Sequence, residues 1–212
     1  MELLNFFRSG TSHRLRIALN LKGLQYEYRA VNLRAEEHLT PEYRRRNPQG
    51  LVPALVVEGR VMTQSPAIIE WLEETWPNPP LLPGDADGRA RVRAMAAIVG
   101  CDIHPLNNRR VLEILRKRLG CDEASVNEWC AHWIAAGFDA IETMLRQDGN
   151  RAGFCFSDGP TLADAYLVPQ VESARRFGVD VARWPAILEV DGNCGTLEPF
   201  RLAAPSNQPD AN

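Results

Sequence analysis

The chain has 212 residues, of which 45% are hydrophobic and 24% charged, and its net charge is −3. These values are typical of a globular protein with one large domain or two small ones, and they exclude the strongly basic surface of most nucleic-acid-binding proteins. The longest apolar stretches, such as residues 94–99, are too short to cross a bilayer. We therefore expect neither a nucleic acid nor a membrane as a partner.

The N-terminal residues predict a strand, a turn and a helix. We expect a short buried strand over residues 3–7 and a helix over residues 14–22. The turn between them carries the hydroxyls of Ser9, Thr11 and Ser12. A helix start directs free backbone N–H groups at one point, which suits an anion, although capping of the helix is the simpler interpretation of these hydroxyls.

The next residues predict one more strand, a weak helix, two strands in a hairpin and a capped helix. Strands are expected over residues 26–31, 54–57 and 60–63, with a weak helix over 36–46. Glu58 and Gly59 have the spacing of a two-residue hairpin turn. Ser65 is a good N-cap and Pro66 fits the first helical position. The order over the first 76 residues or so is therefore β-α-β-α-β-β-α.

Four prolines within residues 77–83 end this pattern, because proline continues neither a helix nor a central strand. We expect a first domain over residues 1–78, a linker over 79–86 and an all-helical domain over 87–212. Helices are predicted over residues 88–119 with an interruption near Pro105, and over 123–146, 161–177 and 185–202. Thr161 and Asp164 form a capping box, and residues 205–212 read as a polar tail.

The number and spacing of the cysteines indicate the cellular compartment and argue against a cysteine-ligated metal site. Five cysteines are scattered along the chain, with no CxxC pair and no spacing typical of metal ligands. Such a pattern is usual for reduced thiols, so we expect a cytoplasmic protein without a metal ion.

The predicted architecture and five sequence stretches resemble the glutathione transferases, and more narrowly their zeta class. The stretches span nearly the whole chain: residues 8–11 with 14–19, residues 47–48 with 52–53, residues 64–70, residues 102–108 and residues 168–177. The resemblance implies a thioredoxin-like α/β N-terminal domain and an all-α C-terminal domain. One motif departs from the class, which commonly has Ser-Ser-Cys where this chain has Ser9, Gly10 and Thr11.

The resemblance also implies a glutathione site. Ser9 is the first choice for the hydroxyl that donates to the glutathione thiolate and Thr11 the second, with Arg8 beside them deepening the effect. Val52 would pair with the cysteinyl backbone of glutathione through a cis peptide bond to Pro53. The remaining contacts expected are Gln64 and Ser65 to the γ-glutamyl carboxylate and His38 to the glycyl end.

Two further groups of residues follow from the resemblance. Asp102, His104 and Asn108 would lie on a long helix facing the cleft of a second subunit, so a homodimer is expected. His104 and Asn108 are four residues apart and would share a helix face. Arginines would bind a dicarboxylate substrate and stabilise an enolate: Arg8, Arg176 and either Arg109 or Arg110, with Arg109 preferred from the helical wheel.

The activity implied is glutathione-dependent cis–trans isomerisation of a maleyl keto acid in the degradation of aromatic compounds. The thiolate would add to the cis double bond, the bond would rotate, and elimination would regenerate glutathione. Maleylpyruvate is favoured over maleylacetoacetate because of residues 9–11 and the doubled arginine at 109 and 110. Two alternatives are a general transferase that conjugates glutathione to electrophiles and a non-catalytic binding protein. The arginines argue against the first, since buried guanidinium groups are costly without an anion.

Overall fold

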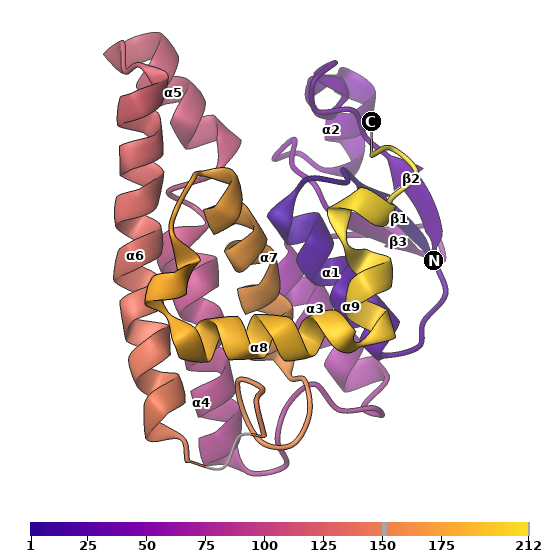
Figure 1. The fold of residues 1–212 in the computed structure, drawn as a ribbon. Helices are drawn as coiled ribbons and strands as arrows, with labels where there is room; N and C mark the ends of the chain where they lie inside the picture. The colour runs from indigo at the N-terminus through magenta and orange to yellow at the C-terminus, as the bar shows by residue number, and fades with distance from the viewer. Residues whose placement is uncertain (150–151, 212) are drawn as a thin grey trace. The chain divides into compact units, whose positions relative to one another are not determined.

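The computed structural model describes residues 1–149 and 152–211, which form two compact units. The first unit runs from Met1 to Leu81 and includes the segment from Thr196 onward, and the second runs from Leu82 to Gly195. The predicted domains place residues 196–212 with the helical half. In the structure that segment packs with the first unit instead, because α9 (Glu198–Ala203) lies against α1 (Gly10–Leu21) (Figure 1).

The first unit is built on a four-stranded mixed sheet in the order β2-β1-β3-β4. The strands are β1 (Glu2–Asn5), β2 (Glu27–Ala30), β3 (Ala54–Val57) and β4 (Arg60–Thr63). β1 pairs in parallel with β2, with Leu3 opposite Tyr28, and β1 and β3 are antiparallel, with Leu3 opposite Leu55. The sheet therefore holds the end of β1, and the turn that follows it, at a fixed place.

Local signals explain most of this unit. Glu58 and Gly59, at φ 50° and 79°, make the two-residue turn between β3 and β4 that the sequence predicts. Leu15, Ala18 and Leu19 of α1 are fully buried and form its apolar face. The predicted first strand is too long, however. β1 ends at Asn5, and Phe6 and Phe7 lie half-buried in the turn.

The other helices of the first unit are α2 (Pro41–Arg46) and α3 (Ser65–Thr75), with 3-10 helices at Glu37–Leu39 and Pro205–Asn207. A buried ion pair ties the end of α3 to α1. Lys22 Nζ lies 2.5 Å from Glu73 Oε2 and also donates to the carbonyls of Trp76 and Pro79, both at 2.7 Å. All three ammonium donors are therefore satisfied inside the unit.

The described residues of the second unit form helices joined by turns and loops, with no strand. It contains α4 (Ala86–Ala97), a π-helix (Ile98–Ile103), α5 (Arg109–Leu119), α6 (Glu123–Gln147), α7 (Leu162–Arg176), a 3-10 helix (Val181–Arg183) and α8 (Pro185–Thr196). The predicted interruption near Pro105 is confirmed, and so is the capping box of Thr161 and Asp164 at the start of α7.

One predicted helix in this part of the chain is wrong. Residues 185–202 form two helices, α8 and α9, which are separated at Leu197. Pro199 lies in the first turn of α9, the place where a missing N–H and a fixed φ are tolerated, whereas inside a continuous helix it would break a hydrogen bond.

Candidate active site

The start of α1 carries a short chain of hydroxyl hydrogen bonds. Ser9 caps the helix, with its Oγ accepting from the Ser12 N–H at 3.3 Å. Ser9 Oγ also lies 2.9 Å from Thr11 Oγ1, and Thr11 Oγ1 donates to the Val52 carbonyl at 3.0 Å. Because a hydroxyl has one proton to donate, Ser9 is the donor in its bond to Thr11. The capping and anion-binding interpretations of this turn are thus compatible.

The same turn offers backbone donors to an anion. The first intrahelical bond runs from the His13 N–H to the Ser9 carbonyl, at 2.8 Å. The preceding amides of Gly10 and Thr11 therefore lie before the first turn of hydrogen bonds, where the helix dipole is positive. Arg8, two residues before Gly10 in the sequence, is exposed. This end of α1 can stabilise a thiolate with its hydroxyls and amides.

The bond between Thr11 and Val52 brings a second element to the start of α1. The Val52–Pro53 peptide bond is cis, as the resemblance implies, and Val52 is half-buried. The Val52 carbonyl keeps a second lone pair beside its bond to Thr11. A peptide ligand lying along this edge can therefore pair its backbone with Val52 while its side chain points to Ser9.

The start of α3 differs from the sequence prediction in one respect. Gln64 is the N-cap, and Ser65 is the first helical residue, so the prediction of Ser65 as the cap is wrong. The Gln64 backbone has φ 68°, in the left-handed region, and its side-chain Nε2 donates to Gln49 Oε1 at 2.5 Å. Strained non-glycine residues of this kind gather at ligand sites.

Arg14 is a residue that the sequence reasoning missed. Its guanidinium group is buried, and its Nη1 donates to the Ser65 hydroxyl at 3.4 Å. A buried positive charge behind the first turn of α3 adds to the attraction of that helix start for a carboxylate. A basic residue on the buried face of α1 was the available signal, because buried arginines are rare unless they are paired.

His38 is buried in the 3-10 helix Glu37–Leu39, which precedes α2 in the first unit. A role of His38 at the glycyl end of glutathione stays a prediction.

The remaining predicted residues belong to the second unit. Asp102 lies exposed in the π-helix, His104 is the residue that ends it, and Asn108 is the N-cap of α5, with Oδ1 accepting from the Arg110 N–H at 3.1 Å. Residues 104–107 form turns between these helices, so His104 and Asn108 do not share a face of one helix. The helical wheel that favoured Arg109 over Arg110 assumed a continuous helix through these residues, so it no longer supports that preference.

The arginines predicted to bind the substrate are exposed in the chain: Arg8, Arg109, Arg110 and Arg176. Arg109 pairs with Glu113 at 2.7 Å, and Arg176, the last residue of α7, donates to Ser173 Oγ at 3.0 Å. The cost of burying unpaired guanidinium groups therefore does not apply to these arginines, and that argument against a general transferase is wrong. Among the described residues, the buried arginines are Arg14 and Arg16.

Within the described ranges 1–149 and 152–211, no cluster of three or more histidine, cysteine or acidic residues could hold a metal ion. No helix in the described part of the chain is both long and apolar enough to cross a membrane.

Two family models match the chain. The model described as the N-terminal domain of glutathione S-transferase matches residues 8–75, and the model of the C-terminal domain matches residues 123–190. A maleylpyruvate isomerase of Ralstonia sp is 65% identical over 211 residues and covers all of both chains. A maleylacetoacetate isomerase of Pseudomonas aeruginosa is 50% identical, over 99% of this chain and 98% of its own.

Solved structures of glutathione transferases and maleyl isomerases also match this chain. The holo structure of a maleylpyruvate isomerase, described as a bacterial zeta-class glutathione S-transferase, has a TM-score of 0.99 at 65% identity over the full length of both chains. The chain belongs to the zeta class of the glutathione transferases. A maleylacetoacetate isomerase from Anaeromyxobacter dehalogenans has a TM-score of 0.88 at 44% identity, over 100% of this chain and 93% of its own. That structure holds dicarboxyethyl glutathione and citrate in its active site.

Proposed function

We propose that this zeta-class chain is a glutathione-dependent cis–trans isomerase of a maleyl keto acid, with maleylpyruvate favoured over maleylacetoacetate. The observation that carries the proposal is the linkage of three elements in the first unit. One helix, α1, is hydrogen-bonded through Thr11 to the Val52 carbonyl and through Arg14 to the Ser65 hydroxyl.

These residues fit glutathione group by group. The hydroxyls and amides at the start of α1 suit its thiolate, Val52 suits its central peptide, and the start of α3 suits its γ-glutamyl carboxylate. When bound, glutathione supplies the sulfur nucleophile that adds to the double bond and is released again. Ser9 and the α1 amides would hold that sulfur as an anion, so no protein cysteine is needed.

The dicarboxylate part of the proposal rests on the arginines Arg8, Arg109, Arg110 and Arg176. Guanidinium groups bind carboxylates with paired hydrogen bonds and would stabilise the negative charge that develops on the keto acid. A dicarboxyethyl group and citrate in the relative from Anaeromyxobacter dehalogenans support this substrate class. We propose in addition a two-fold homodimer in which Asp102, His104 and Asn108 lie near the partner's cleft.

The location proposed is the cytoplasm. All five cysteines are free thiols, which suits a reducing compartment.

A side-by-side assay tests the proposed function. Maleylpyruvate and maleylacetoacetate are each incubated with the purified chain, with and without glutathione, and the fumaryl products are quantified. We expect fumaryl product only with glutathione, and a higher kcat/KM for maleylpyruvate. Faster turnover of maleylacetoacetate would reverse the substrate preference, and no fumaryl product from either compound would refute the function.

A further inference from the structure

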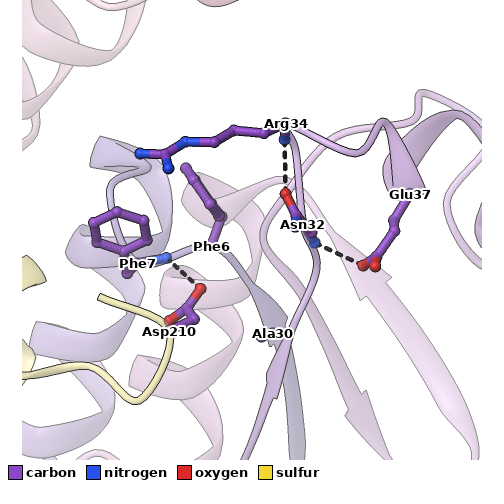
Figure 2. A pocket seen from close by; sticks show the side chains of 7 residues that line it. All are labelled: Phe6, Phe7, Ala30, Asn32, Arg34, Glu37 and Asp210. Atoms are coloured by element: carbon purple, nitrogen blue, oxygen red, sulfur yellow. Dashed lines mark hydrogen bonds between the residues drawn. The ribbon is translucent and has the colours of Figure 1, made fainter. Parts of the chain in front are cut away.

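The C-terminal segment reaches back to the turn that carries Arg8 and Ser9. Asp210 accepts a hydrogen bond from the Phe7 backbone N–H through its Oδ2 at 3.1 Å, and its Oδ1 accepts from the Tyr28 hydroxyl. Figure 2 shows the Asp210 carboxylate directed at the Phe7 amide. This contact joins residues that are 203 positions apart in the sequence. The described part of the expected polar tail, residues 205–211, is therefore folded within the first unit.

Arg16 binds the carbonyl group of Phe7. Its Nη2 donates to the Phe7 carbonyl at 2.9 Å, and its Nε donates to the Ala203 carbonyl at the end of α9 at 3.0 Å. Burial lowers the pKa of Arg16 to about 10, so the guanidinium group is still charged at neutral pH. Both the N–H and the C=O of Phe7 are thus bonded to groups that are themselves tied to the C-terminal segment.

The segment is fastened by contacts of its own. The buried side chain of Gln208 donates to the carbonyls of Leu202 and Ala204, at 2.7 and 2.8 Å, and the Ala211 N–H donates to the Gln208 carbonyl at 3.0 Å. Asp210 therefore has a defined position from which to hold Phe7.

Packing alone does not fix the Phe7 peptide. Phe6 and Phe7 are half-buried and meet edge to face, with ring centroids 4.7 Å apart, in the wall of a cavity of about 270 Å³. Arg34 and Asp210 also line that cavity (Figure 2). A peptide in such a wall depends on its hydrogen bonds for its orientation, and the next two residues along the chain are Arg8 and Ser9.

We propose that Asp210 is a positioning residue for the reaction, which holds the Phe7 peptide so that Ser9 and Arg8 point at the glutathione sulfur. This inference rests on the proposed function, because it deepens the role of the same turn. The competing explanation is that Asp210 only anchors the end of the chain and contributes to stability.

The test uses the full-length chain with Asp210→Ala, Asp210→Asn and a matched control, Asp180→Ala. Asp180 is a second, exposed aspartate that accepts one backbone N–H, from Ala182 at 3.0 Å, and it lies four residues after Arg176 but is not itself a predicted site residue. Three quantities are measured: hydrogen exchange of the Phe7 amide without ligand, kcat and KM of the glutathione-dependent isomerisation, and the midpoint of thermal unfolding.

For Asp210→Ala we expect about tenfold faster exchange at the Phe7 amide and about tenfold lower kcat, since small misplacements of reacting groups are costly, with KM for the maleyl substrate unchanged within about twofold. Asp210→Asn keeps an acceptor for the Phe7 N–H and should recover most of the kcat. Asp180→Ala should have the same hydrogen exchange at the Phe7 amide and the same kcat as the wild-type protein.

Two results would overturn the inference. One is wild-type kcat in Asp210→Ala despite loss of the Phe7 hydrogen bond. The other is unchanged Phe7 exchange in Asp210→Ala, which would show that Asp210 does not hold this peptide. The exchange measurement needs no activity. If the unchanged chain isomerises neither maleyl compound, the proposed function fails by itself, while the exchange arm still decides whether Asp210 holds the turn.

Discussion

Replacement of Ser9 by alanine is expected to raise the pKa of the thiol of bound glutathione. Ser9 can redirect the proton that it now donates to Thr11, 2.9 Å away, to a sulfur anion. A hydrogen bond to a charged group contributes about 1.5–3 kcal/mol, and 1.36 kcal/mol corresponds to one pKa unit, so the thiol pKa should rise by about 1 to 2. At a pH below the pKa of the bound thiol, the thiolate fraction, and with it the isomerisation rate, should fall about 10- to 100-fold.

The measurement is a titration of the bound thiolate by its ultraviolet absorbance, together with the pH profile of kcat/KM. Ser9→Gly is the matched control, because Ser9 also caps α1 through the Ser12 N–H. Alanine at an N-cap costs roughly 1 kcal/mol of stability, whereas glycine costs only a few tenths. Both variants lack the donor, so both should show the same rise in thiol pKa although Ser9→Ala unfolds more easily.

A different pattern would refute this reasoning. If Ser9→Ala had the thiol pKa and the rate of the wild-type protein, while Thr11→Val raised the thiol pKa and lowered the rate, Thr11 would be the thiolate donor. If the loss in Ser9→Ala followed its stability and was absent in Ser9→Gly, Ser9 would be a cap and nothing more.

Three other predictions concern substrate binding, stability and assembly. Replacement by Met or Gln should lower kcat/KM for the maleyl substrate about tenfold at each of four arginines: Arg8, Arg109, Arg110 and Arg176. This is the lower end of the effect of a hydrogen bond to a charged group, because these side chains are exposed. Conjugation of glutathione to an uncharged aromatic electrophile should change little, and equal losses on both substrates would contradict this prediction. Lys22→Met should lower the free energy of unfolding by about 3–5 kcal/mol in urea, because it leaves the Glu73 carboxylate buried without its cation. Arg175→Met, which breaks a partly exposed pair with Asp191, should cost under about 1 kcal/mol, and comparable losses in the two variants would contradict this. Light scattering at micromolar concentration should give twice the chain mass of 23.7 kDa, and a mass of one chain would contradict the homodimer.

Features that depend on a few consecutive residues could be predicted from the sequence. The hairpin at Glu58 and Gly59 follows from turn chemistry, and the start of α7 follows from the capping box of Thr161 and Asp164. The hydroxyls of Ser9, Thr11 and Ser12 likewise predicted a capped helix start that suits an anion, although the helix begins at Gly10 and not at residue 14. In each case the local residues have the same preference that the fold requires.

Features that depend on distant contacts could not be predicted. Ser65 has the right side chain for an N-cap, but the backbone of Gln64 takes the cap position with φ 68° at the end of β4. Arg14 meets Ser65 across 51 positions, and Asp210 meets Phe7 across 203, so no local pattern could indicate either contact. The residues that support the site come from these long-range pairs.

The most direct test of the proposed function is the number of fumaryl molecules formed per glutathione. The assay uses maleylpyruvate in large excess over a limiting amount of glutathione, and it quantifies fumaryl product and free thiol at the end of the reaction. An isomerase releases its sulfur nucleophile after each turnover, so the account predicts many product molecules per glutathione and an unchanged amount of free thiol. One glutathione consumed for each substrate molecule, with a stable conjugate as the product, would contradict the account and identify a conjugating transferase.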